Sequence, residues 1–360
     1  MATFKKILKI SLCCVLCLIF VIVCYLGYML ISYTRIDDNL VLAVNDNPNG
    51  QTVKTDTKYT ILTQNIGFGA YTPDFTFFMD GGESSIAESW ESVINCTYNA
   101  TKTLKSCNPD FLLIQEVDTD SDRSHHVNQR NRIVDEFVEF DSVFAINYHS
   151  PYIMWPLTQP IGTSNSGIMT LSKYQINSAK RRSLPVSRGI SKFLDLDRCY
   201  SVCKILCENG KSLVIYNIHA SAYGGSAEVR TAQLSMLFLD MKTEYENGNY
   251  VVCGGDFNHD FTGTSAKNLN KPHLYASYDW AQPFPDVLIP DGFTKCTNYQ
   301  NGERATCRNC DLPYGENCFT IIVDGFIVSD NVLVNAVDNI QTDFSYSDHS
   351  PVILEFELVS

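Results

Sequence analysis

Beyond residue 57, the chain alternates short apolar runs with polar segments that contain glycine, asparagine or aspartate. The clearest run, Tyr250–Cys253, meets Gly254, Gly255 and then Asp256, with no charge before the aspartate. A short apolar run that closes on glycines predicts a buried strand. Similar runs predict strands at 58–65, 111–117, 142–148, 167–171, 199–207, 212–219, 250–256, 319–329 and 351–358.

Three segments show helical spacing of apolar residues instead. Residues 84–106 bring Ile86, Trp90, Val93 and Leu104 near one face, as an amphipathic helix requires. Residues 127–140 and 228–245 also predict helices, whereas 261–318 predicts a long irregular stretch. No internal repeat is present. We therefore expect a single α/β domain over residues 58–360.

The first forty residues differ from the rest. Ile10–Tyr33 is a run of 24 residues without a charge, long enough as a helix to cross a hydrocarbon layer of about 30 Å. Lysines precede the run and aspartates follow it, a bias that favours a cytoplasmic N-terminus. We expect a cytoplasmic tail at 1–9, a transmembrane anchor at 10–33, a linker at 34–57 and an extracytoplasmic domain at 58–360.

A cleaved signal peptide is the alternative interpretation of this segment. Its apolar region would span about 7–15 residues before a small-x-small cleavage site. The run in this chain is longer, and Tyr25, Tyr28, Met29 and Tyr33 occupy its end. An uncleaved single-pass anchor in the lipid bilayer is therefore favoured.

The composition describes an acidic globular protein. The chain is 45% hydrophobic and 19% charged, with a net charge of −13, so it can bury a large core. An acidic field does not attract polyanions over the whole surface, which disfavours tight nucleic-acid binding. A nuclease whose metal ions neutralise the phosphate locally remains compatible with this charge.

Polar residues stand at or near the ends of several predicted strands. They include carboxylates, amides and histidines: Asn65, Glu116, His219, Asp256, Asn258, Asp324, Asp348 and His349. Carboxylate and amide oxygens suit Mg²⁺, Mn²⁺ or Ca²⁺, and histidine is the usual proton-transfer group near neutral pH. The set predicts metal-assisted attack of water on a phosphate ester.

These residues lie in short motifs that resemble, in order, those of the endonuclease/exonuclease/phosphatase superfamily. The superfamily includes pancreatic deoxyribonuclease, apurinic endonucleases, neutral sphingomyelinases and inositol-polyphosphate 5-phosphatases. The resemblance covers about residues 58–358. The motifs are Thr63-Gln-Asn65-Ile, Gln115-Glu116-Val, Asn217-Ile-His219, Gly255-Asp256-Phe-Asn258, Val323-Asp324-Gly-Phe-Ile-Val-Ser329 and Ser347-Asp348-His349-Ser-Pro351.

The resemblance implies a four-layer α/β sandwich, with two packed mixed β-sheets, outer helices and the site at one edge. It also implies a metal site in which Glu116 is the principal ligand and Asn65 and Asp348 complete the set. One position departs from the pattern. Many members carry a tyrosine after the aspartate where this chain has Gly325.

The same resemblance implies the catalytic roles. His349, oriented by Asp324, would activate the attacking water, and Asp256 would help to position or deprotonate it. His219 would donate a hydrogen bond or a proton to the phosphate, and Asn258 would hold a non-bridging oxygen.

Further phosphate-contact candidates are weaker. They are Asn217, within the His219 motif, and Tyr223 and Arg230, which follow it; a plain helix face is the alternative for Arg230. Arg123, His125 and His126 follow Glu116 in a polar loop. A solvated loop is the alternative for these three.

Ten of the fourteen cysteines follow the apolar run. Cys296, Cys307, Cys310 and Cys318 invite a structural zinc site, but only one Cys-x-x-Cys pair is present where a zinc ribbon has two. Disulfides in an exported domain and unpaired thiols are the alternatives.

The resulting hypothesis is a monomeric, membrane-anchored phosphoesterase that faces outward, and its substrate stays open. A nuclease would need basic surface, and the only evident basic cluster is Lys180-Arg181-Arg182. A sphingomyelinase or another phospholipid phosphodiesterase would need an exposed apolar loop, such as 75–79 or 152–155. A phosphatase of small esters fits equally, whereas a non-catalytic binding protein on this fold should have lost some of the acids or histidines.

Overall fold

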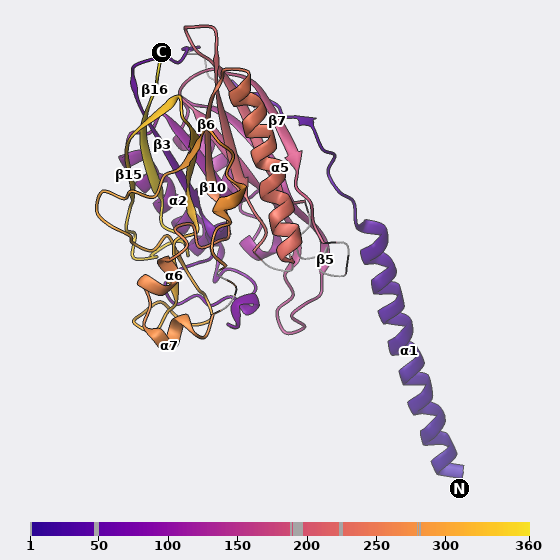
Figure 1. The fold of residues 1–360 in the computed structure, drawn as a ribbon. Helices are drawn as coiled ribbons and strands as arrows, with labels where there is room; N and C mark the ends of the chain where they lie inside the picture. Colours follow the sequence, from indigo (N-terminus) through magenta and orange to yellow (C-terminus); the bar gives the residue numbers. More distant parts are fainter. Residues whose placement is uncertain are drawn as a thin grey trace.

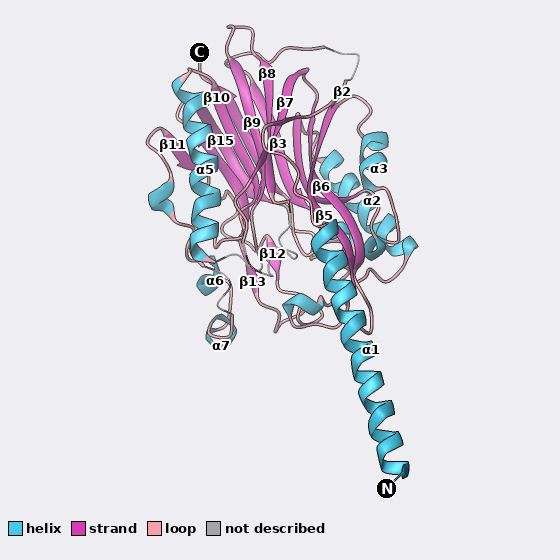
Figure 2. Cartoon of the chain, turned by 90° about the vertical axis from the view of Figure 1, so that its right-hand side faces the viewer, coloured by secondary structure: helices cyan, strands magenta, loops and turns pink. Residues whose placement is uncertain are grey.

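The computed structural model describes residues 2–46, 50–187, 189, 197–222, 226–278, 280 and 282–360. Two mixed seven-stranded sheets pack face to face, with helices on the outside (Figures 1 and 2). The first sheet has the order β1 (Leu40–Val41), β7 (Ile176–Ser183), β8 (Cys199–Leu206), β9 (Ser212–His219), β10 (Tyr250–Asp256), β14 (Asp324–Ser329), β11 (Phe293–Lys295). The second has the order β15 (Val332–Asn339), β16 (Val352–Leu358), β3 (Lys58–Asn65), β4 (Phe111–Asp118), β6 (Gly162–Ser172), β5 (Asp141–Ile153), β2 (Val44–Asn45).

The main hydrophobic core lies between the two sheets and continues under helix α5 (Ala227–Glu246). Leu113 of β4 and Val251 of β10 belong to this core, and so do Leu237 and Met241 of α5. A second apolar cluster packs α2 (Trp90–Ser106) and α3 (Gln129–Glu136) on the outer face of the second sheet. The predicted four-layer α/β sandwich is confirmed.

Both outer helices on the second sheet are shorter than predicted. Helix α2 begins at Trp90 rather than at residue 84, because the Ser89 side chain accepts a hydrogen bond from the Ser92 backbone and caps the helix. Helix α3 begins after Asn128, whose side chain caps it in the same way.

The strand predictions need three corrections. The predicted strand 319–329 divides into β13 (Thr320–Ile321) and β14. Strands β7 and β15 were not predicted. Within its described residues, the irregular stretch 261–318 contains short elements: α6 (Ser265–Asn268), α7 (Pro272–Tyr275), the 3-10 helix η4 (Asp286–Leu288), β11 and β12 (Cys307–Arg308).

The predicted linker contributes to the fold. Leu40–Val41 pairs with β7 and Val44–Asn45 pairs with β5, so the segment adds an edge strand to each sheet. Asp38 also accepts hydrogen bonds from the Arg182 side chain and the Ser183 backbone. This segment therefore fixes the start of the domain relative to α1.

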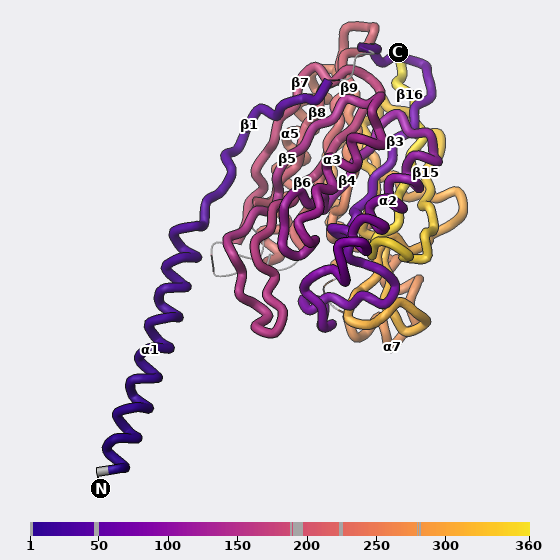
Figure 3. Tube along the Cα trace, turned by 180° about the vertical axis from the view of Figure 1, so that it is seen from behind, coloured from indigo at the N-terminus to yellow at the C-terminus, as the bar shows by residue number. Residues whose placement is uncertain are grey.

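Helix α1 (Ala2–Ser32) leaves the sandwich and runs away from it along one side (Figure 3). Residues Thr3–Ser32 are long and apolar enough to cross a membrane, although a signal sequence near the N-terminus would pass the same test. Its last turns contact the tip of the β5–β6 hairpin through Tyr25 and Tyr28.

Candidate active site

A cavity of about 300 Å³ opens at the edge where strand ends of both sheets meet. Seven of the predicted site residues line it: Asn65, Glu116, His219, Asp256, Asn258, Asp348 and His349. Asp324 lies directly behind His349. Sequence motifs that are far apart along the chain are thus brought to one place by the sheet topology.

On the first sheet, three site residues lie side by side through ordinary strand register. Asp256 ends β10, where it pairs with His219 at the end of the parallel strand β9. It pairs on its other side with Asp324 at the start of the antiparallel strand β14. The Nε2 atom of His219 is 3.6 Å from the Oδ2 atom of Asp256.

His349 and Asp324 form a buried pair. The Nδ1 atom of His349 is 2.7 Å from Asp324 Oδ2, and the Nε2 atom on the opposite side of the ring is 3.9 Å from Asp256 Oδ2. Burial alone would lower the pKa of His349, but the Asp324 carboxylate raises it well above the ordinary value. Burial raises the pKa of Asp256 to about 7. The imidazole is therefore held in one orientation beside a carboxyl group that readily exchanges a proton.

On the second sheet, the backbone departs from regular strand geometry. The pairing of β4 with β6 shifts between Ile114 and Val117, and Glu116 has φ = 55°. This bulge directs the Glu116 side chain to the cavity. A left-handed conformation in a residue with a Cβ costs roughly 1–3 kcal/mol and is typical of functional sites.

Asn65, at the end of β3, joins the two sheets across the cavity. Its Nδ2 atom donates to Glu116 Oε1 at 3.3 Å and to Asp256 Oδ2 at 3.1 Å. Its Oδ1 atom accepts a hydrogen bond from the Gly67 backbone. The amide thus lies between two carboxylates of opposite sheets.

Asp348 reaches the cavity from the loop before β16. Burial raises its pKa to about 7, and the nearby Glu116 carboxylate adds to this effect. Gly67, at φ = 53°, lies so close that a Cβ there would stand 2.7 Å from Asp348 Oδ1 and closer still to the Tyr71 ring. The glycine is required by both its conformation and the close approach.

The acidic residues of the cavity fit a hard divalent cation. Glu116 and Asp348 supply carboxylate oxygens, the preferred ligands of Mg²⁺, and a buried carboxylate favours a cation close by. Ligand atoms of a second group, Asp256, Asp324 and His349, lie within 4.8 Å of one another. In that group Asp324 and His349 already bind each other, so Asp256 is its available oxygen donor.

The phosphate-contact candidates Asn258 and His219 have different surroundings. Asn258, at φ = 51°, donates its backbone N–H to Asp256 Oδ1 and its Nδ2 to the Ala220 carbonyl, and it lines the cavity. His219 lies 3.4 Å from the Asn147 amide. Burial lowers the pKa of His219 well below its ordinary value, and the Arg198 charge adds to this effect. A neutral His219 can donate one hydrogen bond into the cavity.

Two further candidates, Asn217 and Arg230, do not line the cavity. Asn217 is buried between the sheets, where it accepts from Gln115 and donates to the Met169 carbonyl. Its amide is used to join strands. Arg230 is half-buried on α5 and is not among the cavity residues. Tyr223 lies outside the described residues.

The polar loop after Glu116 is not a uniformly solvated loop. Arg123 lines the cavity, where it makes two hydrogen bonds to Asp118 and stacks over the Phe68 ring at 4.0 Å. His125 instead contacts the Ala87 carbonyl. His126 is exposed and pairs with Asp120.

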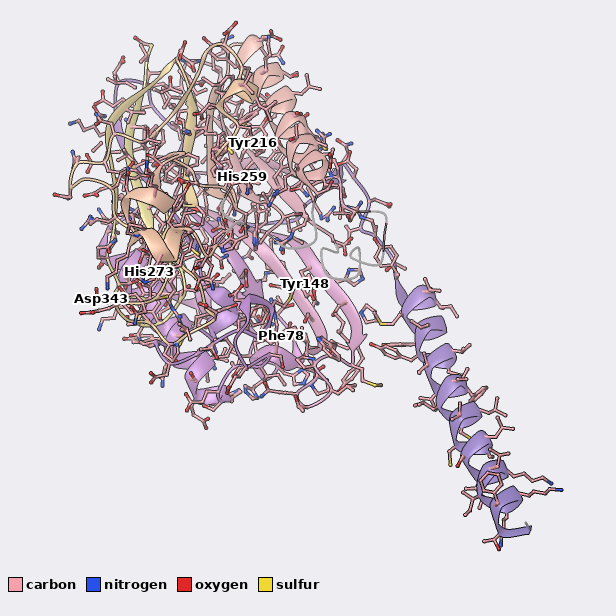
Figure 4. The ribbon with its side chains drawn as sticks, turned by 60° about the horizontal axis from the view of Figure 1, so that its bottom comes forward. Phe78, Tyr148, Tyr216, His259, His273 and Asp343 are labelled. Atoms are coloured by element: carbon pink, nitrogen blue, oxygen red, sulfur yellow. The ribbon has the colours of Figure 1, made fainter. Side chains whose placement is uncertain are left out.

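Several cavity residues were missed because no motif marks them. Asn147, Arg198 and Arg308 are polar, and Tyr148 of β5, labelled in Figure 4, adds an aromatic wall together with Tyr278 and Trp280. Arg308 is tied to the backbone carbonyls of the 72–75 loop. Isolated arginines and aromatic residues occur throughout the sequence, so only the fold selects these.

The basic cluster at 180–182 is occupied within the domain. Arg181 is buried and donates to the carbonyls of Ile146 and Asp197. Arg182 pairs with Asp38 and Asp240. This cluster does not form an open basic surface.

Of the three alternatives for Cys296, Cys307, Cys310 and Cys318, the structure shows unpaired thiols and, among its described residues, no zinc-compatible cluster of these four. Within the described residues, the metal-compatible group of three or more side chains is Asp256, Asp324 and His349, without any cysteine. All fourteen cysteines are free thiols. All four are buried, but their surroundings differ: Cys307 lines the cavity next to His349, whereas the Cys318 thiol donates to the Asn309 carbonyl.

Comparison with known proteins gives the family. The model of the "Endonuclease/Exonuclease/phosphatase family" matches residues 95–349. The chain belongs to the endonuclease/exonuclease/phosphatase family. No curated protein sequence matches the chain. The family membership shows a phosphoester hydrolase, and its members are generally dependent on divalent metals.

Solved structures of other family members share the fold at low sequence identity. An endonuclease/exonuclease/phosphatase from Bacteroides vulgatus is 16% identical, covers 84% of this chain and 100% of its own, and has a TM-score of 0.53. ANGEL2, a 2′,3′-cyclic phosphatase, is 15% identical over 89% of this chain and 99% of its own, with a TM-score of 0.56. TDP2 of D. rerio, complexed with a single-strand DNA product, is 13% identical over 84% of this chain and 100% of its own, with a TM-score of 0.51.

Proposed function

We propose that this family member is a membrane-anchored, divalent-metal-dependent phosphoesterase that hydrolyses a phosphodiester or phosphomonoester by attack of water. The observation that carries the proposal is the buried Asp324–His349 pair, whose second ring nitrogen, Nε2, lies 3.9 Å from Asp256 Oδ2. Buried charge of this kind is costly to a fold, and at a cavity it is typical of catalysis.

His349 is the general base in this proposal. Its Nδ1 is bound to Asp324, so the Nε2 atom is left to take a proton from water. The carboxylate fixes the tautomer and stabilises the imidazolium that forms. Asp256, which lies 3.9 Å from that nitrogen, positions the water from the other side.

Glu116, Asn65 and Asp348 would hold the metal ion. The Asn65 amide now presents nitrogen to Glu116 and Asp256, so a turn of the amide would present oxygen to a cation. A bound Mg²⁺ or Mn²⁺ would polarise the phosphoryl group and neutralise charge on the phosphate. The chain's own contribution is to place these oxygens rigidly on two strands and one loop.

His219 and Asn258 act on the phosphate oxygens. His219 is neutral at physiological pH and donates a hydrogen bond as negative charge grows on the phosphate. Asn258 is fixed by two hydrogen bonds to neighbouring residues, which keeps its amide at the cavity wall.

Turnover of bis(4-nitrophenyl) phosphate by the full chain in detergent, with and without Mg²⁺, tests this function. We expect His349→Ala to lower kcat by about 10³-fold, in the usual range for removal of a general base, and chelation to abolish activity. His126→Ala is the matched control, because His126 is an exposed histidine outside the cavity. Chelator-resistant turnover that survives His349→Ala would overturn the proposal.

A panel of substrates then distinguishes the classes: single-stranded and duplex DNA, RNA, sphingomyelin and inositol phosphates. The arginines at 181 and 182 are paired inside the domain, which leaves little basic surface for a polyanion. This supports lipid or small phosphate esters over nucleic acid.

The proposed topology places the N-terminus in the cytoplasm and the catalytic domain outside. Lys5, Lys6 and Lys9 flank the apolar helix on its N-terminal side, which supports this orientation. A reporter fused after Ser360 should be active only outside the membrane, and the chain should keep α1 when its mass is measured. A cytoplasmic reporter or a cleaved helix would contradict the topology.

A further inference from the structure

The tip of the β5–β6 hairpin, residues 152–161, is an exposed apolar surface. The exposed fractions are 62% for Trp155, 72% for Leu157 and 42% for Met154. No charged residue occurs between His149 and Lys173. Exposed apolar side chains that gather without charge are typical of an interaction surface rather than of ordinary protein surface.

This tip is attached directly to α1. The Tyr25 hydroxyl donates to the Tyr152 carbonyl and accepts from the Met154 backbone, and the Tyr28 hydroxyl accepts from the Tyr152 backbone. Met29 packs with Ile153 and Ile161 in a small buried cluster. The hairpin and the helix therefore form one unit at this end of the domain.

The direction of these contacts shows how far the tip extends along α1. From Tyr152 to Met154 the hairpin advances along α1 from Tyr28 to Tyr25, which is toward the N-terminus of the helix. Tyr25 lies eight residues inside the end of the uncharged run Ile10–Tyr33, or about 12 Å along a helix. The tip therefore lies level with the C-terminal end of this run, at the depth where the hydrocarbon layer meets the interface.

We propose that the β5–β6 tip docks into the outer side of the same bilayer that α1 crosses, as a second membrane contact of the domain. The proposal rests on α1 being retained as an anchor, but not on any catalytic activity. Tyr152 and Trp155 have the amphipathic rings that favour the interface between water and lipid. Met154 and Leu157 supply apolar area that water otherwise covers.

The backbone of the tip is suited to an apolar surrounding. Gln159 donates its N–H to the Pro156 carbonyl, and Ile161 donates to the Trp155 carbonyl. Pro156 and Pro160 have no N–H to satisfy. These donors are therefore not left unpaired in an apolar layer, where each would cost several kilocalories per mole.

Docking of the tip also fixes the cavity relative to the membrane. Ile161 packs on Met29 of α1 and lines the cavity on its other side. Phe78, labelled in Figure 4, packs on the same cluster, and its neighbours Phe77 and Met79 line the cavity. The cavity wall thus continues into the surface that contacts the bilayer.

Tryptophan quenching by brominated acyl chains tests the proposal. The full chain is reconstituted into phosphatidylcholine vesicles, with and without brominated lipid, and the emission of wild type, Trp155→Phe and Trp90→Phe is compared. Trp90 is the matched control because it is 50% exposed on α2, outside the hairpin. We expect Trp155→Phe to remove more than half of the quenchable emission and Trp90→Phe to leave it unchanged.

Flotation of the same vesicles separates the two ways in which the proposal can fail. Protein that floats but shows equal quenching in wild type and Trp155→Phe overturns docking of the tip, while α1 stays an anchor. Protein that does not float overturns both the anchor and the tip. Neither result depends on turnover, so the proposed phosphoesterase activity is tested separately, by the hydrolysis of bis(4-nitrophenyl) phosphate.

Discussion

The two sheets bring their polar groups to one cavity by different means. On the first sheet, Asp256 sits in register between His219 and Asp324, so regular strand pairing alone places three groups together. On the second sheet, Glu116 reaches the cavity through a bulge in a left-handed conformation. Regular pairing adds no free-energy cost to that of burying the charged groups. The bulge adds the cost of an unfavourable backbone conformation at Glu116.

This difference indicates which kind of substitution should disrupt each half of the site. The first sheet's three groups depend on side-chain chemistry, because Asp256, His219 and Asp324 occupy regular strand positions without positive φ. The second sheet depends on its backbone, because Glu116, Gly67 and Phe68 all have positive φ. Substitutions on the first sheet should therefore remove a reactive side chain, whereas substitutions on the second sheet should displace the metal-binding side chains by changing the backbone.

The largest effect is expected from Asp324→Asn on the first sheet. The amide keeps the shape but loses the charge that raises the pKa of His349, so that pKa should fall. The base then loses its proton at lower pH, and the acid limb of the kcat profile should move to lower pH. We also expect kcat at its maximum to fall about 10²–10⁴-fold, because the tautomer is no longer fixed.

The pH dependence of kcat with Mg²⁺ measures both consequences. Asp120→Asn is the control, because Asp120 forms an exposed pair with His126 outside the cavity. A fall in kcat with an unmoved acid limb would show that Asp324 supports the structure and does not tune the base.

A smaller effect is expected from Gly67→Ala on the second sheet. A Cβ at this position would meet the Tyr71 ring and Asp348 Oδ1, so Asp348 must shift and metal affinity should fall about tenfold or more. Gly210→Ala is the matched control, because Gly210 has φ = 81° and open space around it. Both substitutions carry the same kind of backbone penalty, and only Gly67→Ala should raise the Mg²⁺ concentration needed for half-maximal turnover. Equal metal dependence in the two variants would contradict the role of this close approach.

The sequence predicted the first sheet's half of the site more directly than the second. Asp256, His219 and Asp324 are polar residues at the ends of apolar runs, and such ends can be recognised from the hydrophobic pattern of the sequence. Asn217 carries the same signal but faces the interior, where it joins strands β4, β6 and β9. Asn217 and His219 are two residues apart and share one face of β9. Their positions along the strand differ, because only His219 stands at the strand end that meets the cavity.

The missed elements have identifiable physical causes. The sequence of strand β7 is mostly polar, so hydrophobic periodicity does not predict a strand there. Arg181 can be buried in this strand because its guanidinium donates hydrogen bonds to backbone carbonyls. The mostly polar composition of residues 34–57 predicts a linker, but the short strands Leu40–Val41 and Val44–Asn45 within it pair with β7 and β5. Arg198 and Arg308 reach the cavity from segments that no local pattern distinguishes. Long-range pairing decides these positions.

The smallest effect tests the strain on the second sheet directly. Glu116→Gly and Glu116→Gln both remove the carboxylate, so both should lose metal-dependent turnover. Only glycine adopts φ = 55° without a steric penalty, so Glu116→Gly should unfold at higher urea concentration than Glu116→Gln. We expect a difference of about 1 kcal/mol in the free energy of unfolding, measured in chelator. Because the two variants share the loss of charge, a difference of this sign isolates the backbone. Equal stability would mean that the bulge at Glu116 is unstrained, and the contrast between the two sheets would then rest on side-chain chemistry alone.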